Sequence, residues 1–309
     1  MASGVMMPAK VTIAVVPRDR FSVFRRCIDA IYASTHVPFR LLVVTGGTDN
    51  ATKTYLRELE RRQRGVSVVY FDHFLAQGEA REIALRHTDD RFVVLLENDT
   101  IMHDNWLVRL LECIHEERAA MVAPLVLWYR GVHAAGCVFE ERGERGVTAF
   151  RHKILYTEIR RKQIDYAETH CVLLDREHLP FAVLFDDVEP FDADLGLTLR
   201  RHRASVFLEP RAVATYSAPP PLHVGDVGLF RFRWDPAIWE AGNRRFMAKW
   251  GVRYDPAAKI ASYRRQQLKL GLARWWPNRF SVATSNATVS LANLLSSGLT
   301  RRRQSYSSG

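Results

Sequence analysis

The sequence predicts an α/β fold whose mostly parallel sheet is flanked by helices. Short runs rich in β-branched and aliphatic residues alternate with amphipathic helical patterns through the first hundred residues, as in successive βαβ units. The 309-residue chain is 47% hydrophobic, which is enough for a substantial core. Ligands of such sheets bind at the carboxyl ends of the strands, so polar side chains at those ends are candidates for a functional site.

The first half of the chain supplies four strands and four helices in alternation. Strands are predicted at VTIAVV (11–16), FRLLVV (39–44), VSVVYF (66–71) and RFVVLLE (91–97). Helices are predicted at residues 21–34, 52–63 and 79–87, and a fourth follows Asp104 or Asn105, either of which is a plausible N-cap. The fourth helix carries an apolar stripe from Trp106 to Ile114.

The second half is predicted to complete the same sheet. Strand candidates are MVAPLVLWY, HAAGCVFE, YAETHCVLL and ASVFLEP, and FDADLGLTLRRH has a helical pattern. The proline-rich stretch at 217–223 marks a loop before another helical pattern at 234–251. We therefore expect a flexible N-terminus at 1–9, one domain at 10–250 and a basic, aromatic extension at 251–309 with a disordered end.

Charge and cysteine usage limit the partners and the compartment. The net charge of +10 suits an anionic partner, such as a nucleotide, a phosphorylated lipid, nucleic acid or an acidic membrane. Nucleic acid is disfavoured, because the basic residues are dispersed and no recognition motif appears. The four cysteines lack metal-type spacing, which favours a reduced, cytoplasmic chain. From the lack of a long apolar segment near residue 1 and of any run of about 18 apolar residues, we expect neither a signal peptide nor a membrane-spanning helix.

The C-terminal extension mixes aromatic with basic residues. Trp275, Trp276 and Phe280 stand among lysines and arginines. This mixture suits the interface of an anionic membrane, and would make the protein a peripheral membrane protein. The alternative is that the tryptophans pack on the domain while the arginines remain solvated.

The strand predicted at 91–97 runs directly into Glu97 and Asp99. Carboxylates at i and i+2 of an extended backbone point to the same side. At about 5 Å and an effective dielectric constant of about 20 they would repel by roughly 3 kcal/mol, unless a cation, a proton or solvent intervenes. The pair is therefore a candidate metal site, although Asn98-Asp99 is also a good turn sequence.

Taken in order, these features resemble the family 2 glycosyltransferases, whose catalytic domain has the GT-A fold. The resemblance covers roughly residues 10–250, and its best segments are VTIAVVPRDR, RFVVLLENDTIMHDNWLVRLL and FDADLGLTLRRHRASVFLEPRAVATY. In that family a strand ends in a D-x-D motif, followed by an apolar turn, a tryptophan and an amphipathic helix. Glu97-Asn98-Asp99 and Trp106 match this arrangement.

The resemblance implies a reaction and its main residues. A sugar, expected to be a hexose, would pass with inversion from a nucleoside-diphosphate sugar to a hydroxyl of a glycan, a lipid-linked acceptor or a small molecule. Asp99 would coordinate Mn²⁺ or Mg²⁺ at the donor's diphosphate, and Glu97 would help to hold the metal or contact the donor's ribose or sugar. Asp192 takes the place of the catalytic base and Asp194 that of the following aspartate, with Glu189 in reserve. The alternative is that Asp192 or Asp194 only caps the helix.

The resemblance also implies residues that contact the donor, together with departures from the family pattern. The donor-contacting candidates are Pro17, Arg18, Asp19, Thr45, Asp49, Arg81, Glu97 and Asn98. Arg18 and Arg81 are equally compatible with solvated surface charges. Thr45 stands where the family has an aspartate, and Tyr216 stands where many members have a metal-binding histidine, so that His223 becomes the third metal candidate. These departures leave a rival open, a catalytically degenerate GT-A-like binding or scaffold protein.

Overall fold

The computed structural model describes residues 11–128, 131–144, 147–178, 191–217 and 220–253, and the single residue Arg265. The chain divides into two units, and the first, residues 1–218 and 222–260, contains every element described below. The predicted N-terminal segment 1–9, the predicted tail with Trp275 and Trp276, and the reserve base Glu189 lie outside the described residues.

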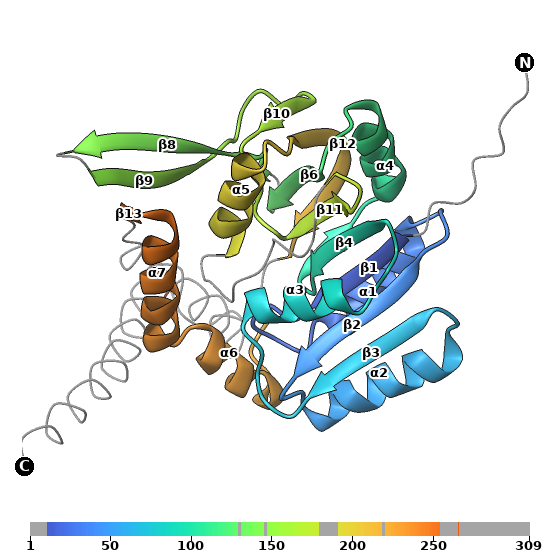
Figure 1. Ribbon diagram of the computed structural model, residues 1–309. Coiled ribbons are helices and arrows are strands. Elements are labelled where there is room, and N and C mark those ends of the chain that lie inside the picture. The colour runs from blue at the N-terminus through green and yellow to red at the C-terminus, as the bar shows by residue number, and fades with distance from the viewer. Residues whose placement is uncertain are drawn as a thin grey trace, which may run out of the picture. The chain divides into compact units, whose positions relative to one another are not determined.

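One large mixed sheet organises the described part of the chain, with the strand order β10-β12-β6-β11-β4-β1-β2-β3 (Figure 1). Strands β3, β2, β1 and β4 are parallel, β11 runs antiparallel to both β4 and β6, and β12 is parallel to β6. The strands are β1 (Val11–Val16), β2 (Arg40–Gly46), β3 (Val66–Phe71), β4 (Phe92–Glu97), β5 (Thr100–Met102), β6 (Met121–Trp128), β7 (Gly131–Ala134), β10 (Lys162–Ile164), β11 (Cys171–Asp175) and β12 (Val206–Tyr216). The predicted α/β class is confirmed.

Helices cover both faces of this sheet, because successive side chains of a strand point to opposite sides. Ile13 and Val15 of β1 belong to a core cluster shared with the first and fourth helices, whereas Ala14 and Val16 belong to a second cluster shared with the third and fifth. The helices are α1 (Phe24–Ser34), α2 (Asn50–Arg62), α3 (Gln77–Arg86), α4 (Trp106–Glu116), α5 (Phe191–Arg201), α6 (Val227–Arg233) and α7 (Pro236–Trp250), with a 3₁₀ turn, η2, at Val224–Asp226. No helix among the described residues has the length and apolar character needed to cross a membrane.

A smaller sheet joins the long hairpin of β8 (Cys137–Glu144) and β9 (Val147–Ile154) to β13 (Val252–Arg253) (Figure 1). The predicted strand HAAGCVFE is therefore divided between β7 and β8, which is a correction to the sequence-based prediction. Gly136 lies at the division with a φ of +84°, and a Cβ atom there would lie 2.7 Å from Ile164. The left-handed backbone interrupts the strand at this point.

The starts of two helices differ from the sequence pattern for local reasons. The helix predicted from residue 21 begins at Phe24, and the backbone N–H groups of Phe21 and Ser22 before it donate to Asp226 Oδ1 at 2.8 and 3.0 Å. Asn105 occupies the N-cap position of α4, but it has a φ of 60° and its side chain makes no capping hydrogen bond. The start of α4 is instead held by Trp106, which is fully buried and donates from Nε1 to Thr35 Oγ1 at 2.9 Å.

Candidate active site

The parallel pairing of β1 with β4 brings the ends of these two strands together. Val16 lies opposite Glu97, so Arg18, two residues beyond β1, and Asn98, the first residue beyond β4, meet at the carboxyl edge of the sheet. The Asn98 side chain joins the two segments, accepting from the Arg18 backbone N–H at 3.0 Å and donating to the Arg20 carbonyl at 2.7 Å. Asn98 is 1% exposed, and its contact with a donor stays a prediction.

Arg18 lies between the two carboxylates that the sequence places at this edge. Its Nη1 atom lies 3.1 Å from Asp99 Oδ2, and its Nε atom lies 3.5 Å from Glu97 Oε2. Nη1 also donates to the Tyr216 hydroxyl. The side chain of Arg18 is only 15% exposed, which rules out the alternative of a solvated surface charge. The protein thus supplies one cation to the repelling carboxylate pair by itself.

Glu97 is held on both of its carboxylate oxygens. Oε1 accepts from Arg81 Nη2 at 2.8 Å, and Oε2 lies 2.7 Å from Nδ1 of His170. Burial alone would raise the pKa of Glu97, but the charges of His170, Arg18 and Arg81 together lower the pKa well below its ordinary range. Glu97 is therefore ionised, and its carboxylate holds the side chains of Arg18, Arg81 and His170 in place.

Asp99 differs from Glu97, because one of its oxygens has no partner. Oδ1 is buried without a hydrogen bond, while Oδ2 contacts Arg18. Burial raises the pKa of Asp99 to about 6, with Glu97 adding to the rise and Arg18 opposing it. A hard cation with oxygen ligands would satisfy such an oxygen and favour the ionised carboxylate, so this site fits the expected Mn²⁺ or Mg²⁺.

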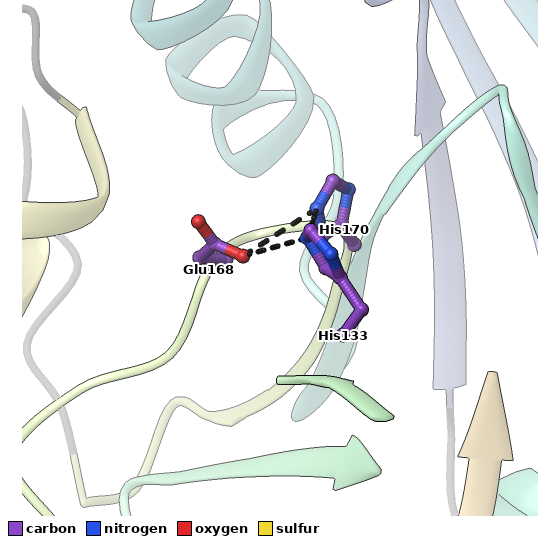
Figure 2. A group of neighbouring side chains, drawn as sticks. All are labelled: His133, Glu168 and His170. Carbon is purple, nitrogen blue, oxygen red and sulfur yellow. Dashed lines mark hydrogen bonds and ion pairs between the residues drawn. The ribbon is translucent and has the colours of Figure 1, made fainter. Parts of the chain in front are cut away.

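Two groups of side chains in the described part of the chain bring potential ligand atoms within 4.8 Å of one another. One consists of Glu97, Asp99 and His170, and the other of His133, Glu168 and His170 (Figure 2). His223 belongs to neither group, and its backbone N–H donates to Asp226 Oδ2 at 3.0 Å just before η2. Its role as a metal ligand stays a prediction.

His170 is the functional candidate that sequence reasoning missed. It directly precedes β11, and its carbonyl accepts from the Glu97 backbone N–H at 3.0 Å, because antiparallel β11 begins where β4 ends. Its ring stacks on Tyr216 with centroids 4.7 Å apart. The polar pair Thr169-His170 before an apolar run was a visible signal, but only the sheet order shows which strand end it meets.

Asp192 and Asp194 lie in the first turn of α5 and have different partners. Asp192 is half-buried and accepts from Thr169, through the backbone N–H at 3.2 Å and through the hydroxyl. Burial raises the pKa of Asp192, although Arg81 and Thr169 oppose the rise. Asp194 instead connects α5 to α7, because it accepts a hydrogen bond from Nε1 of Trp250 at 2.7 Å and forms an ion pair with Lys249 at 3.0 Å, both of which lie in α7. Neither contact is a cap of α5.

The remaining donor candidates have partners within the protein. The hydroxyls of Thr45 and Thr48 lie 2.7 Å apart, and Asp49 caps α2 by accepting from the N–H groups of Ala51 and Thr52 at 3.0 and 3.1 Å. Asp19 pairs with Arg20 at 2.5 Å and accepts from Trp234 Nε1 at 3.2 Å, while Pro17 is buried at the end of β1. Their predicted donor contacts remain predictions, and each residue has a structural reason to be present.

Arg81 is a buried support of this site and not a surface residue of α3. Its side chain is 1% exposed and also bonds Gln77 Oε1 at 3.1 Å. We expect Arg81→Ala to lower the free energy of unfolding by about 3–5 kcal/mol, because it leaves the buried charge of Glu97 without its closest guanidinium. Urea denaturation measures this. Arg86→Ala on the same helix is the control: this side chain is 73% exposed, so a change within about 0.5 kcal/mol is expected. Equal effects of both variants would contradict the support role.

Comparisons with known proteins give the family and the fold of the chain. The family model described as glycosyl transferase family 2 matches residues 12–176. The solved structure "Crystal structure of GalNAc-T7 with UDP, GalNAc and Mn2+" is similar, with a TM-score of 0.56, 12% identity and coverage of 85% of this chain. This chain spans about half, 55%, of that protein. A mannosyltransferase from Pyrobaculum calidifontis, PcManGT in complex with GDP-Man and Mn2+, is similar at a TM-score of 0.51, with 12% identity and 89% of each chain covered. No curated protein matches the sequence.

The structural matches, at this low identity, show the fold, and the family model shows the family. The matched segment takes up more than half of the 309 residues and includes β4, Glu97, Asp99 and all of β1 except Val11. The predicted GT-A-like fold class is therefore confirmed. The chain belongs to glycosyl transferase family 2.

Proposed function

We propose that this glycosyltransferase transfers a sugar, a hexose, from a nucleoside-diphosphate sugar to an acceptor hydroxyl with inversion. The observation that carries the proposal is the unpartnered buried oxygen of Asp99, which lies at the carboxyl edge of the sheet beside Arg18. Two structural neighbours with this fold are described with a nucleotide or nucleotide sugar and Mn²⁺, which supports the same ligand classes here.

The charges at the strand ends suit a leaving nucleoside diphosphate. A divalent cation at Asp99 would stabilise the negative charge that develops on the diphosphate as the bond to the sugar breaks. Arg18 would have to exchange part of its contact with Asp99 for the phosphate oxygens. Glu97 contacts Arg81 and His170, so its proposed role is to position these groups near the donor.

Asp192 is proposed as the general base. The acceptor oxygen forms its bond to the anomeric carbon as the bond to the diphosphate breaks, and the hydroxyl proton passes to Asp192. A single displacement of this kind inverts the configuration at the anomeric carbon. Thr169 orients the Asp192 carboxylate through two hydrogen bonds. The next residue, His170, contacts Glu97, so the segment Thr169-His170 connects the proposed base to the carboxylates at the strand end.

The pH dependence of turnover follows from the environment of Asp192. A base must be ionised, and its raised pKa places the acidic limb of the rate profile above the ordinary range of an aspartate. Thr169→Val removes the hydroxyl that favours the ionised form, so we expect the limb to move up by about one pH unit. The control is Thr54→Val on α2, whose hydroxyl donates to the Asn50 carbonyl. A limb that stays in place in Thr169→Val would contradict the assignment of the base.

Release of nucleotide tests the proposed activity directly. The purified chain is incubated with a panel of UDP- and GDP-sugars and Mn²⁺, with glycan, lipid-linked and small-molecule acceptors added in turn. We expect one donor to release its nucleotide and the acceptor to increase the rate. Absence of release across the panel would favour the rival, a GT-A-like binding or scaffold protein. The internal partners of Thr45, Asp49 and Asp19 are the observations that favour this rival.

A further inference from the structure

A second cluster of metal-binding side chains lies on the other side of His170 from Glu97. It consists of His133 from β7, Glu168 from the segment before β11, and His170 itself. Figure 2 shows the two imidazole rings and the carboxylate converging on one point. Glu168 Oε2 lies 3.1 Å from His133 Nε2 and 3.7 Å from His170 Nε2, and the two Nε2 atoms lie 3.3 Å apart.

These three distances match the edges of a tetrahedral coordination sphere. With metal–ligand bonds of about 2.0–2.1 Å, neighbouring ligands of a tetrahedral zinc ion lie about 3.3 Å apart. Of the observed distances, 3.3 Å equals this value, 3.1 Å is slightly shorter and 3.7 Å is somewhat longer. Three ligand atoms are therefore placed so that one ion could reach all of them without large movements of the side chains.

Glu97 determines which nitrogen of a neutral His170 is free to bind a metal. The Nδ1 atom of His170 lies 2.7 Å from the ionised Glu97 carboxylate, which can only accept a hydrogen bond there. A neutral His170 therefore carries its proton on Nδ1 and directs the lone pair of Nε2 toward Glu168 and His133. A carboxylate behind a metal-binding histidine is the usual arrangement of zinc sites, where it orients the ring and raises its basicity.

The surrounding aromatic rings hold the two imidazoles in place, and part of the site is open. His170 stacks on Tyr216 at 4.7 Å, and His133 lies edge-on to Trp128 at 6.1 Å. The side chains of His133 and Glu168 are each 20% exposed, whereas that of His170 is 6% exposed. An ion could thus enter from the side of His133 and Glu168, and a fourth position would be left for water or another ligand.

We propose that His133, Glu168 and His170 form a binding site for a divalent transition metal of the zinc class, distinct from the site at Asp99. Two imidazoles and one carboxylate suit zinc or a similar ion, whereas the carboxylate oxygens of Asp99 and Glu97 suit Mn²⁺ or Mg²⁺. The inference goes beyond the proposed transferase reaction and does not depend on it, because it rests on the geometry of this cluster alone.

Zinc binding tests the proposal without any measurement of transferase activity. The full chain, freed of metal with a chelator, is titrated with Zn²⁺ by isothermal calorimetry, and with Co²⁺ by its visible absorption, which is strong in tetrahedral sites. We expect one tight equivalent. His133→Ala and Glu168→Gln should each weaken the affinity by about 100-fold or more, since the loss of groups that only support a ligand already costs about 10–100-fold.

Two matched variants locate the ion. Asp99→Asn should keep the zinc affinity, because its oxygens belong to the other group. His87→Ala, an exposed histidine at the end of α3, should also keep it. Circular dichroism of each variant separates loss of binding from loss of fold, and Glu168→Gln retains the size of the side chain. No zinc binding by the wild type, unchanged affinity in both His133→Ala and Glu168→Gln, or loss of binding in Asp99→Asn would overturn the proposal.

Discussion

Replacement of Asp192 by asparagine is expected to lower kcat by about 10²–10⁴, while KM for the donor stays nearly unchanged. Asparagine keeps the size of the side chain and can still accept from Thr169, so the hydrogen bonds at 3.2 Å and from the hydroxyl survive. It cannot take a proton from the acceptor. Steady-state kinetics with a saturating acceptor measure the loss, and thermal unfolding confirms that the fold is retained.

Asp194 and Glu189 provide the comparisons for this result. Asp194→Asn removes the ion pair with Lys249 but not the base, so we expect a lower melting temperature with kcat changed only a few-fold. Glu189→Gln tests the alternative base that the resemblance to the family left in reserve. An inactive Glu189→Gln together with an active Asp192→Asn would move the base to Glu189.

The second large effect is expected at Asp99. Asp99→Asn should abolish stimulation by Mn²⁺ or Mg²⁺ and lower turnover by about 10²–10³, because the leaving diphosphate then loses its divalent cation. Asparagine keeps the shape of the side chain and can still accept from Arg18, so the strand end should remain folded. Turnover is measured over a range of Mn²⁺ concentrations after removal of bound metal.

His223 allows the same titration to test the ligand that the resemblance to the family implies. If His223 binds the metal, His223→Ala should shift the activation curve to higher Mn²⁺ concentration; if it does not, the curve should stay in place. Metal-dependent turnover that is unchanged in Asp99→Asn would remove the strand-end carboxylate from the mechanism. In that case Arg18, whose Nη1 atom lies 3.1 Å from Asp99 Oδ2, would be the positive charge left to stabilise the diphosphate.

The sequence alone predicted the features that depend on local patterns. Continuous apolar runs such as VTIAVV and RFVVLLE predicted the buried parallel strands β1 and β4, because strands covered on both faces show no polar alternation. The apolar stripe from Trp106 to Ile114 predicted α4. Glu97 and Asp99 were placed correctly at a strand end, since the strand pattern stops there and parallel strands present their carboxyl ends to ligands.

Only the tertiary structure decided which side chains meet at that edge. Antiparallel β11 places His170 beside Glu97, although the two residues are 73 positions apart in the chain. Arg81 of α3 also contacts Glu97, whereas the helical pattern alone was equally compatible with a solvent-facing side chain. His133 lies in β7. The sequence pattern predicted one continuous strand, HAAGCVFE, where the structure has the end of β7 and the start of β8. Hydrophobic periodicity records whether a residue faces the core or solvent, but not the order of strands in the sheet. The partners of a buried charge depend on that order, because they come from elements that are distant in sequence and adjacent in space.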